Sequence, residues 1–196
     1  MKNENDFKLY RKTKETSISI YLDLKTPGQI DIITGIGFFD HMLTTLAFHS
    51  GWSMTLKAEG DLHTGDHHTV EDCAIIIGQA IEQQLYDRSG ITRFGYAYAP
   101  LDDSLSRAVI DLASRPNSCV NLSLAREKVG ELSCENVTHF FQTLTTYARF
   151  TLHLDTIRSI NDHHAIESAF KAFALAFKSA IQPAGNDKPL STKGVL

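Results

Sequence analysis

The sequence contains little cysteine and no long apolar run, and each shortage excludes a class of protein. Its three cysteines form no closely spaced pair, which argues against a disulfide framework or a cysteine-based zinc knot and indicates a reducing compartment. The apolar runs are short, as in Ala74 to Ile77, so we expect no segment that spans a membrane. The first twelve residues lack the apolar stretch of a signal peptide, and we therefore expect a cytoplasmic protein.

The chain also lacks a strong excess of one charge. Its 19 basic and 23 acidic residues give a formal net charge of −4, so the composition predicts neither a nucleic-acid partner nor a membrane partner. Apolar residues make up 42% and charged residues 21% of the 196 residues, which is typical of a folded globular protein and excludes disordered and fibrous classes. This length predicts one domain or two tightly fused halves.

Histidine is the residue that stands out, because five of the nine histidines lie in two short clusters. Segment 66–72 reads DHHTVED and segment 162–168 reads DHHAIES, which indicates an internal repeat. The same apolar stripe follows both segments, and its spacing of three to four residues predicts a helix that Asp66 or Asp162 caps at its N-terminus. The matched positions are Val70 and Ile166, Ala74 and Phe170, Ile77 and Phe173, Ile81 and Phe177, and Leu85 and Ile181.

The repeat extends upstream. In each half a histidine, His41 or His139, precedes a helix-like segment and then a strand-like one, and residues 16–24 and 106–113 alternate like half-buried strands. Each half reads β-β-α-β-α, so we predict an α+β fold by internal duplication, with both helices of each half packed on one face of its sheet. The predicted single domain has halves at about 7–90 and 91–182 and a C-terminal tail at 183–196. Whether the halves meet through helices or through sheets stays open.

The chemistry lies in the repeated His-His-x-x-Glu motif. His67 and Glu71 are four residues apart and His68 and Glu71 three, so each pair can meet on the helix surface. Adjacent histidines point about 100° apart on a helix, which suits two different metal ions better than one. Imidazole with carboxylate suits zinc, manganese, iron or nickel rather than calcium or magnesium.

Repetition doubles the ligand set. Together with the two upstream histidines, the motifs predict eight metal ligands: His41, His67, His68, Glu71, His139, His163, His164 and Glu167. An even division gives two sites of three histidines and one glutamate. Each site would leave two positions of an octahedral ion free for substrate or water.

Long motifs throughout the chain resemble those of the imidazoleglycerol-phosphate dehydratase family. They are GIGFFDHML (35–43), DLHTGDHHTVEDCAIIIGQA (61–80), RFGYAYAPLDDSLSRAVIDLASRP (93–116), NDHHAIESAFKAFA (161–174) and STKGVL (191–196). The resemblance implies a duplicated fold with a four-stranded sheet and two helices per half. It also implies a monofunctional enzyme of histidine biosynthesis that forms a homo-oligomer of 24 subunits, with manganese at the subunit contacts.

The resemblance also implies roles for individual residues. It places two Mn²⁺ ions per subunit on the eight ligands given above, although zinc or another divalent transition metal would suit the same donors. The implied contacts to a small phosphorylated substrate are Glu15, His41, His49, His67, Glu71, Arg93, Arg115, His163, Lys171, Ser191 and Lys193. For the catalytic acid and base we favour Glu15, with Asp102 as the second candidate.

The implied reaction removes water from imidazole glycerol phosphate and gives imidazole acetol phosphate. The proton that leaves is weakly acidic, because no carbonyl group is next to its carbon. Metal ions on both nitrogens of the substrate ring would let the ring expel the hydroxyl group, which would then make that proton acidic. Two alternatives use the same ligands: a dinuclear metallohydrolase, and a non-catalytic protein that stores metal or is held together by it. The Ser191 and Lys193 pair in the tail favours the dehydratase.

Overall fold

The structure, a computed structural model, describes residues 7–194, so the end of the predicted tail at 195–196 lies outside the described residues. The first half contains β1 (Lys8–Lys12), β2 (Thr16–Asp23), β3 (Ile30–Ile33), α1 (Gly37–Ser50), β4 (Ser53–Gly60) and α2 (His67–Leu85). The second half contains β5 (Phe94–Leu101), β6 (Ser104–Asp111), β7 (Asn117–Asn121), β8 (Lys128–Val129), β9 (Leu132–Ser133), α3 (Cys134–Ala148), β10 (Thr151–Arg158) and α4 (Asp162–Ala180).

The two halves have the same sheet topology, which confirms the predicted duplication. The strand order is β1-β2-β4-β3 in one sheet and β5-β6-β10-β7 in the other. In both sheets the first three strands in this order pair antiparallel and the last strand pairs parallel to its neighbour. Among residues 7–194, the short β8–β9 hairpin of the second half has no counterpart in the first.

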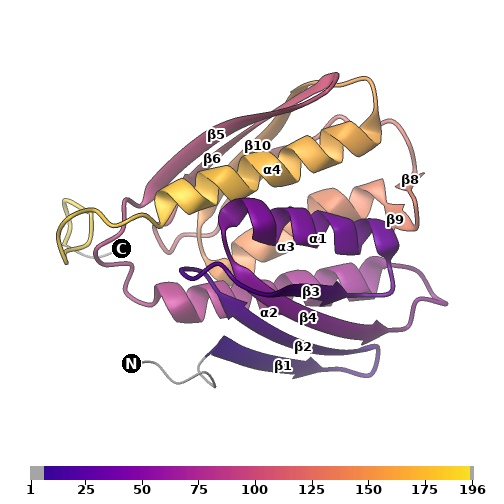
Figure 1. Ribbon diagram of the computed structural model, residues 1–196, viewed down its shortest axis with the longest axis horizontal. Coiled ribbons are helices and arrows are strands. Elements are labelled where there is room, and N and C mark those ends of the chain that lie inside the picture. The colour runs from indigo at the N-terminus through magenta and orange to yellow at the C-terminus, as the bar shows by residue number, and fades with distance from the viewer. Residues whose placement is uncertain (1–6, 195–196) are drawn as a thin grey trace.

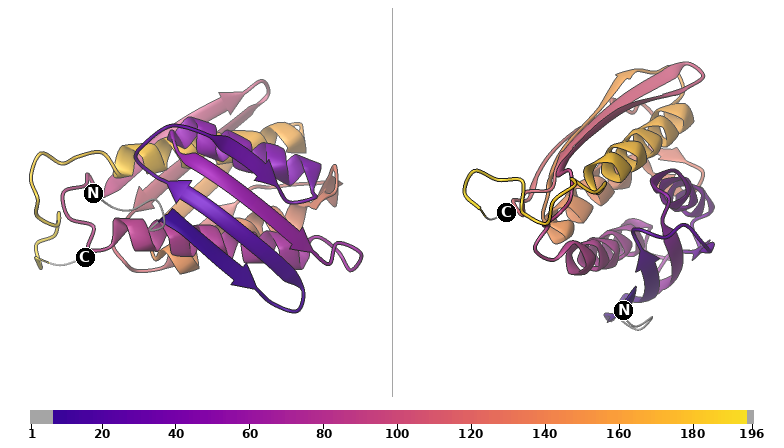
Figure 2. Two further views of the ribbon diagram at one scale, coloured as in Figure 1. Left: turned by 60° about the horizontal axis from the view of Figure 1, so that its bottom comes forward. Right: turned by 60° about the vertical axis from the view of Figure 1, so that its left-hand side comes forward.

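The four helices lie between the two sheets (Figures 1 and 2). Each sheet therefore carries its helices on one face, as predicted, and the halves meet through helices. The main contacts between helices cross between the halves, because α1 packs against α4 and α2 packs against α3. Among residues 7–194, no helix has the length and apolar character needed to cross a membrane.

Both predicted apolar stripes are buried in this helical layer, except that Ile181, which follows the end of α4, is only partly buried. Gly78 lies where α2 passes close to α3, and a Cβ atom there would come within 2.7 Å of the Tyr147 Cβ atom and 3.0 Å of the Ala148 nitrogen. Only glycine fits this approach without a shift of backbone. The close packing of the two helices fixes the relative position of residues that the halves contribute to one site.

The strand pattern of the sequence identifies the central strands only. The segments at 16–24, 52–57, 106–113 and 150–154 correspond to β2, β4, β6 and β10, which all occupy inner positions of the sheets. The main sheet of each half has four strands rather than the three of the β-β-α-β-α reading. The edge strands β1 and β7 alternate between exposed and half-buried residues, so they lack the apolar period by which a buried strand is recognised.

Asp66 precedes α2 as predicted, but its carboxylate accepts hydrogen bonds from the Ser133 nitrogen and hydroxyl at 2.7 and 2.8 Å. The prediction for Asp162 was wrong, because α4 is capped by Asn161, whose side chain accepts from the His163 nitrogen at 2.9 Å. The Asp162 carboxylate instead accepts from the backbone before β8. Both carboxylates thus hold a helix start against a neighbouring segment.

Candidate active site

The α1–α4 contact brings together His41, His163 and Glu167, which we call the α1–α4 cluster. One ligand atom from each residue lies within 4.8 Å of the others. A Glu167 carboxylate oxygen lies 3.2 Å from His41 Nε2 and 3.3 Å from His163 Nε2. His41 lies in the second turn of α1 and the other two residues in the first turns of α4, so the cluster requires both halves.

The α2–α3 contact forms an equivalent α2–α3 cluster from His67, Glu71 and His139. A Glu71 carboxylate oxygen lies 3.0 Å from His139 Nε2, and the His67 and His139 rings stack with centroids 4.8 Å apart. The Nδ1 atom of His67 lies 2.9 Å from the side-chain oxygen of Asn136. This contact turns the other ring nitrogen of His67 toward the cluster, as outer partners do for metal-binding histidines.

The donor sets of both clusters suit a divalent transition metal. Two imidazoles and one carboxylate are the ligands that manganese, iron and zinc accept, and every ligand atom is close enough to share one ion. The predicted division into three histidines and one glutamate does not form within one chain in the described residues. Each cluster has two histidines, and His68 and His164 lie apart from both.

His68 and His164 are each held by an aspartate. Nδ1 of His68 lies 3.0 Å from the Asp61 carboxylate, and Nδ1 of His164 lies 2.5 Å from that of Asp103. The hydrogen bond to Asp61 raises the pKa of His68, and the hydrogen bond to His164 lowers the pKa of Asp103 to about 2. A histidine held by a carboxylate at Nδ1 presents Nε2 for metal binding. The structure therefore orients both rings away from the clusters of their own chain, as the 100° separation of adjacent histidines predicts.

The two candidate acid–base residues lie in equivalent hairpin turns beside these outward histidines. Glu15 connects β1 with β2, its backbone oxygen accepts from the Asp61 nitrogen at 3.1 Å, and its charge contributes to the raised pKa of His68. Asp102 connects β5 with β6, and its carboxylate lies 3.7 Å from Nε2 of His164. Both side chains are exposed, so both can reach a ligand outside their own chain.

Lys171 and His49 lie farther along the same α1–α4 contact. Lys171 Nζ is 2.8 Å from a Glu167 carboxylate oxygen, one helical turn away, as the spacing predicts. Burial acts to raise the pKa of Glu167, but Lys171 and His41 outweigh it and hold the pKa below its ordinary value. Burial, with help from the Lys171 charge, lowers the pKa of His49. At neutral pH this surface therefore offers a carboxylate, an ammonium group and an uncharged imidazole.

The predicted phosphate ligands meet at a second place. Arg93, Arg115, Ser191 and Lys193 line one cavity of about 930 Å³ between the end of β6 and the C-terminal tail. Arg93 is fixed there by two bonds to the Asp111 carboxylate, at 2.7 and 3.0 Å, and by a bond of 2.6 Å to the Leu190 backbone oxygen. The tail is thus attached to the turn between the halves while its Ser191 and Lys193 face the cavity.

Two further cations line this cavity that were not among the predicted ligands, Arg149 and Lys188. A signal for the first is present in the repeat, because Arg149 occupies the position that Gly51 has in the first half. The second lies in the polar tail, where a lysine is ordinary, and nothing in the sequence marks it.

The metal-ligand clusters and this basic cavity lie at opposite ends of the helices. Arg93 is at the C-terminal end of α4, where its nitrogen donates to the Ala180 oxygen at 2.9 Å. Thirteen residues separate Glu167 from Ala180, which amounts to about 20 Å of helix. One small ligand cannot contact the α1–α4 cluster and the basic cavity of the same chain.

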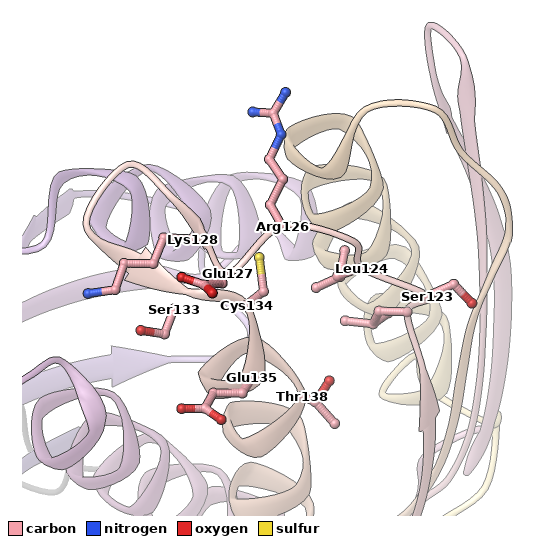
Figure 3. A pocket seen from close by; sticks show the side chains of 10 residues that line it. Ser123, Leu124, Arg126, Glu127, Lys128, Ser133, Cys134, Glu135 and Thr138 are labelled. Carbon is pink, nitrogen blue, oxygen red and sulfur yellow. The ribbon is translucent and has the colours of Figure 1, made fainter.

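Another cavity, of about 530 Å³, lies at the start of α3 (Figure 3). Its lining carries both signs of charge, on Arg126, Lys128, Glu127 and Glu135, and Figure 3 shows the Arg126 side chain directed away from the others. None of the predicted site residues lines this cavity, so it has no part in the predicted site.

Comparison with known proteins places these features in one family. The model of the imidazoleglycerol-phosphate dehydratase family matches residues 34–177. The chain belongs to that family. It is 50% identical to the imidazoleglycerol-phosphate dehydratase of Candida glabrata, with 95% of this chain and 97% of that protein covered. It is 54% identical to that of Saccharomyces cerevisiae, over 85% of this chain and 76% of that protein.

Solved structures of imidazoleglycerol-phosphate dehydratases agree. The enzyme from Staphylococcus aureus matches with a TM-score of 0.80 and 40% identity, over 90% of this chain and 99% of that one. The enzyme from Pyrococcus furiosus, solved in complex with (S)-C348, matches with a TM-score of 0.81 and 34% identity, over 96% of this chain and all of that one. The chain is therefore an imidazoleglycerol-phosphate dehydratase, a hydro-lyase of histidine biosynthesis, and neither a metallohydrolase nor a storage protein.

Proposed function

We propose that this dehydratase uses two Mn²⁺ ions per subunit, one on each cluster. The observation that carries the proposal is the pair of equivalent clusters, each with two histidines and a glutamate, beside two histidines that face outward. His41, His163 and Glu167 would hold one ion and His67, Glu71 and His139 the other. When bound, the metals supply Lewis acidity to the nitrogens of the substrate ring.

The remaining residues bind the substrate and move its protons. Arg93, Arg115, Ser191 and Lys193 bind the phosphate, because a dianion requires fixed positive charge and hydrogen-bond donors. Lys171 and His49 lie along the α1–α4 contact and orient the glycerol chain between ring and phosphate. A carboxylate oxygen of Glu15 takes the proton from the carbon beside the one that loses its hydroxyl group, with Asp102 as the alternative. The hydroxyl group and this proton together make up the water that is released, and the enol that remains becomes the ketone when its hydroxyl proton moves to carbon.

The complete site takes residues from more than one subunit. The substrate has three carbons between its ring and its phosphate, so it cannot bridge the length of α4 between metal ligands and basic cavity. A neighbouring subunit must supply one of the two parts. The outward His68 and His164 then complete the ligand sets of neighbouring clusters. This sharing motivates the homo-oligomer, for which 24 subunits is our prediction.

Within each subunit, the proposed catalytic domain consists of the halves at about 7–90 and 91–182. Of the tail at 183–196, residues between 186 and 193 line one side of the phosphate cavity. The backbone of the tail is tied to the turn between the halves by the bond from the Ala184 nitrogen to the Gly90 oxygen at 2.8 Å, whereas Ser191 and Lys193 are exposed or half-buried.

Co-expression of two inactive variants tests the shared site. Glu71→Gln removes a metal ligand and Arg115→Ala removes a phosphate ligand, and each variant alone should have almost no activity. If the two residues of one site come from different subunits, random mixing restores about a quarter of the sites. A mixture that stays as inactive as its components would show that each chain holds a complete site. The mass of the mixed assembly, compared with that of the unaltered enzyme, checks that the variants assemble together.

A further inference from the structure

The residue that ends α3 has an unfavourable backbone conformation. Arg149 follows the helix with φ of +52° and ψ of +58°, in the left-handed region. A side chain there crowds the following carbonyl oxygen, which is why helices commonly end in glycine at this position. The first half follows that rule, because the equivalent Gly51 ends α1 with φ of +75°. The second half therefore keeps an arginine where glycine would fold more easily.

Arg149 also adds positive charge beside a buried cation. The Arg88 side chain is buried between the halves, where it donates to the backbone oxygens of Ala148 and Arg149 at 2.9 and 2.7 Å and pairs with Glu82. Burial lowers the pKa of Arg88, and the charge of Arg149 lowers it further while Glu82 opposes both. Repulsion between the two guanidinium groups is a second cost of having arginine at position 149.

The contacts of Arg149 within the chain are weak. In the part of the chain that the structure describes, its guanidinium lies 3.4 Å from the Ser114 backbone oxygen and 3.7 Å from a Glu82 carboxylate oxygen. The side chain is 56% exposed, and an exposed ion pair at this separation contributes little to stability. The fold thus gains little in return for the backbone strain and the repulsion.

The exposed guanidinium faces the basic cavity that Arg93 and Arg115 line. Arg93 and Ser114 of the same cavity also have left-handed backbone, with φ of +72° and +55°. Non-glycine residues in this region concentrate where a fold holds side chains for a ligand. The strain at position 149 is therefore one of three such distortions around one cavity.

We propose that Arg149 is a further phosphate-binding residue of this dehydratase. The inference rests on the proposed function, in which this cavity holds the substrate phosphate. A planar guanidinium group can donate two parallel hydrogen bonds to phosphate oxygens, which a lysine cannot do. Arg149 thus serves to bind the phosphate, although its backbone conformation and its repulsion from Arg88 destabilise the fold.

The test separates binding from stability in the assembled, metal-loaded enzyme. Arg149→Gly should raise KM for imidazole glycerol phosphate by about tenfold, which corresponds to about 1.4 kcal/mol. It should leave kcat within about twofold and weaken the binding of inorganic phosphate by a similar factor, measured by calorimetry. Its melting temperature should be unchanged or higher, because glycine relieves the strain and the repulsion. Arg149→Lys should recover only part of the affinity, because it restores the charge without the planar pair of donors.

Two control variants test for effects of backbone strain and of net charge. Gly51→Ala should lower the melting temperature without changing KM. The size of this decrease measures the cost of a side chain in the left-handed backbone conformation at the equivalent position of the first half. Lys57→Gln, on the outer surface of the β4 strand, should change neither quantity and excludes a general effect of net charge. If Arg149→Gly lowers the melting temperature or the mass of the assembly, or leaves KM and phosphate binding unchanged, the proposal is wrong. Arg115→Ala distinguishes the two failures, because it must still weaken phosphate binding if the cavity is the phosphate site.

Discussion

The two equivalent glutamates of the metal-ligand clusters should respond differently to the same substitution. Glu167 and Lys171 are 2.8 Å apart and their side chains are 13% and 19% exposed, whereas Glu71 is 38% exposed and contacts His139. Glu167→Gln leaves the Lys171 ammonium half-buried without a charged partner. A hydrogen bond to a charged group contributes about 1.5–3 kcal/mol, and because glutamine still offers a neutral oxygen we expect a loss of about 1–2 kcal/mol.

The measurement is thermal or urea unfolding of the metal-free protein at neutral pH. The expected loss lowers the melting temperature by roughly 2–8 °C in a chain of this length. Glu71→Gln is the matched control and should change the free energy of unfolding by less than about 0.5 kcal/mol. Elemental analysis of the metal-loaded variants should show that each has lost about one metal per subunit and that turnover is nearly absent.

The contribution of Glu167 to stability depends on pH. Because the folded-state pKa of Glu167 lies below its ordinary value of 4.5, its stabilisation is present above pH 4.5 and is lost as the pH falls through the folded-state pKa. The difference between Glu167→Gln and the unaltered chain should therefore disappear in acid. Equal loss of stability in the two glutamine variants at neutral pH would refute the role given to Lys171.

Three further results are expected. Chelation should reduce the assembly to smaller oligomers, and added Mn²⁺ should restore the full assembly, because metals shared between subunits link metal-binding energy to assembly. An unchanged mass would place both sites within one chain. Truncation after Leu190 should leave folding and metal content unchanged but lower kcat/KM by at least about tenfold, since it deletes Ser191 and Lys193 from the phosphate cavity. Unchanged steady-state kinetics would show that neither residue belongs to the site. Of the three cysteines, only the exposed Cys119 should react quickly with a thiol reagent, because burial raises the pKa of Cys73 and Cys134, so rapid reaction of more than one thiol in the folded protein would contradict the structure.

The sequence predicts this fold well where a pattern is repeated and buried. The helix stripes and the central strands have a clear apolar period, and the second copy of the motif predicts the ligand set. The edge strand β3 has no such period, because its four residues are half-buried or exposed. Its pairing with β4 depends on contacts with residues distant in the sequence, which local pattern does not contain.

For the site, the sequence predicts which residues of one helix lie side by side. It does not predict which residues of different elements meet. The pairs His163 with Glu167 and Glu167 with Lys171 are one turn apart and meet as expected. The sequence alone could not tell that His68 belongs with Asp61 rather than with the α2–α3 cluster, because that choice depends on where β4 ends relative to α2. Arg149 was missed because the repeat shows only that arginine stands where the first half has Gly51, whereas the folded chain brings it beside Arg93 and Arg115.

The exchange of ligands between the halves has a consequence for the origin of the chain. Each cluster combines one histidine from the first helix of one half with a histidine and a glutamate from the second helix of the other. Neither half could form a cluster by folding alone, but two identical halves related by a twofold axis would form both at once. The sequence repeat and this reciprocal arrangement together fit an ancestor half as long that acted as a symmetric dimer. In one fused chain, unlike in such a dimer, one helix end can carry arginine while the equivalent end carries glycine.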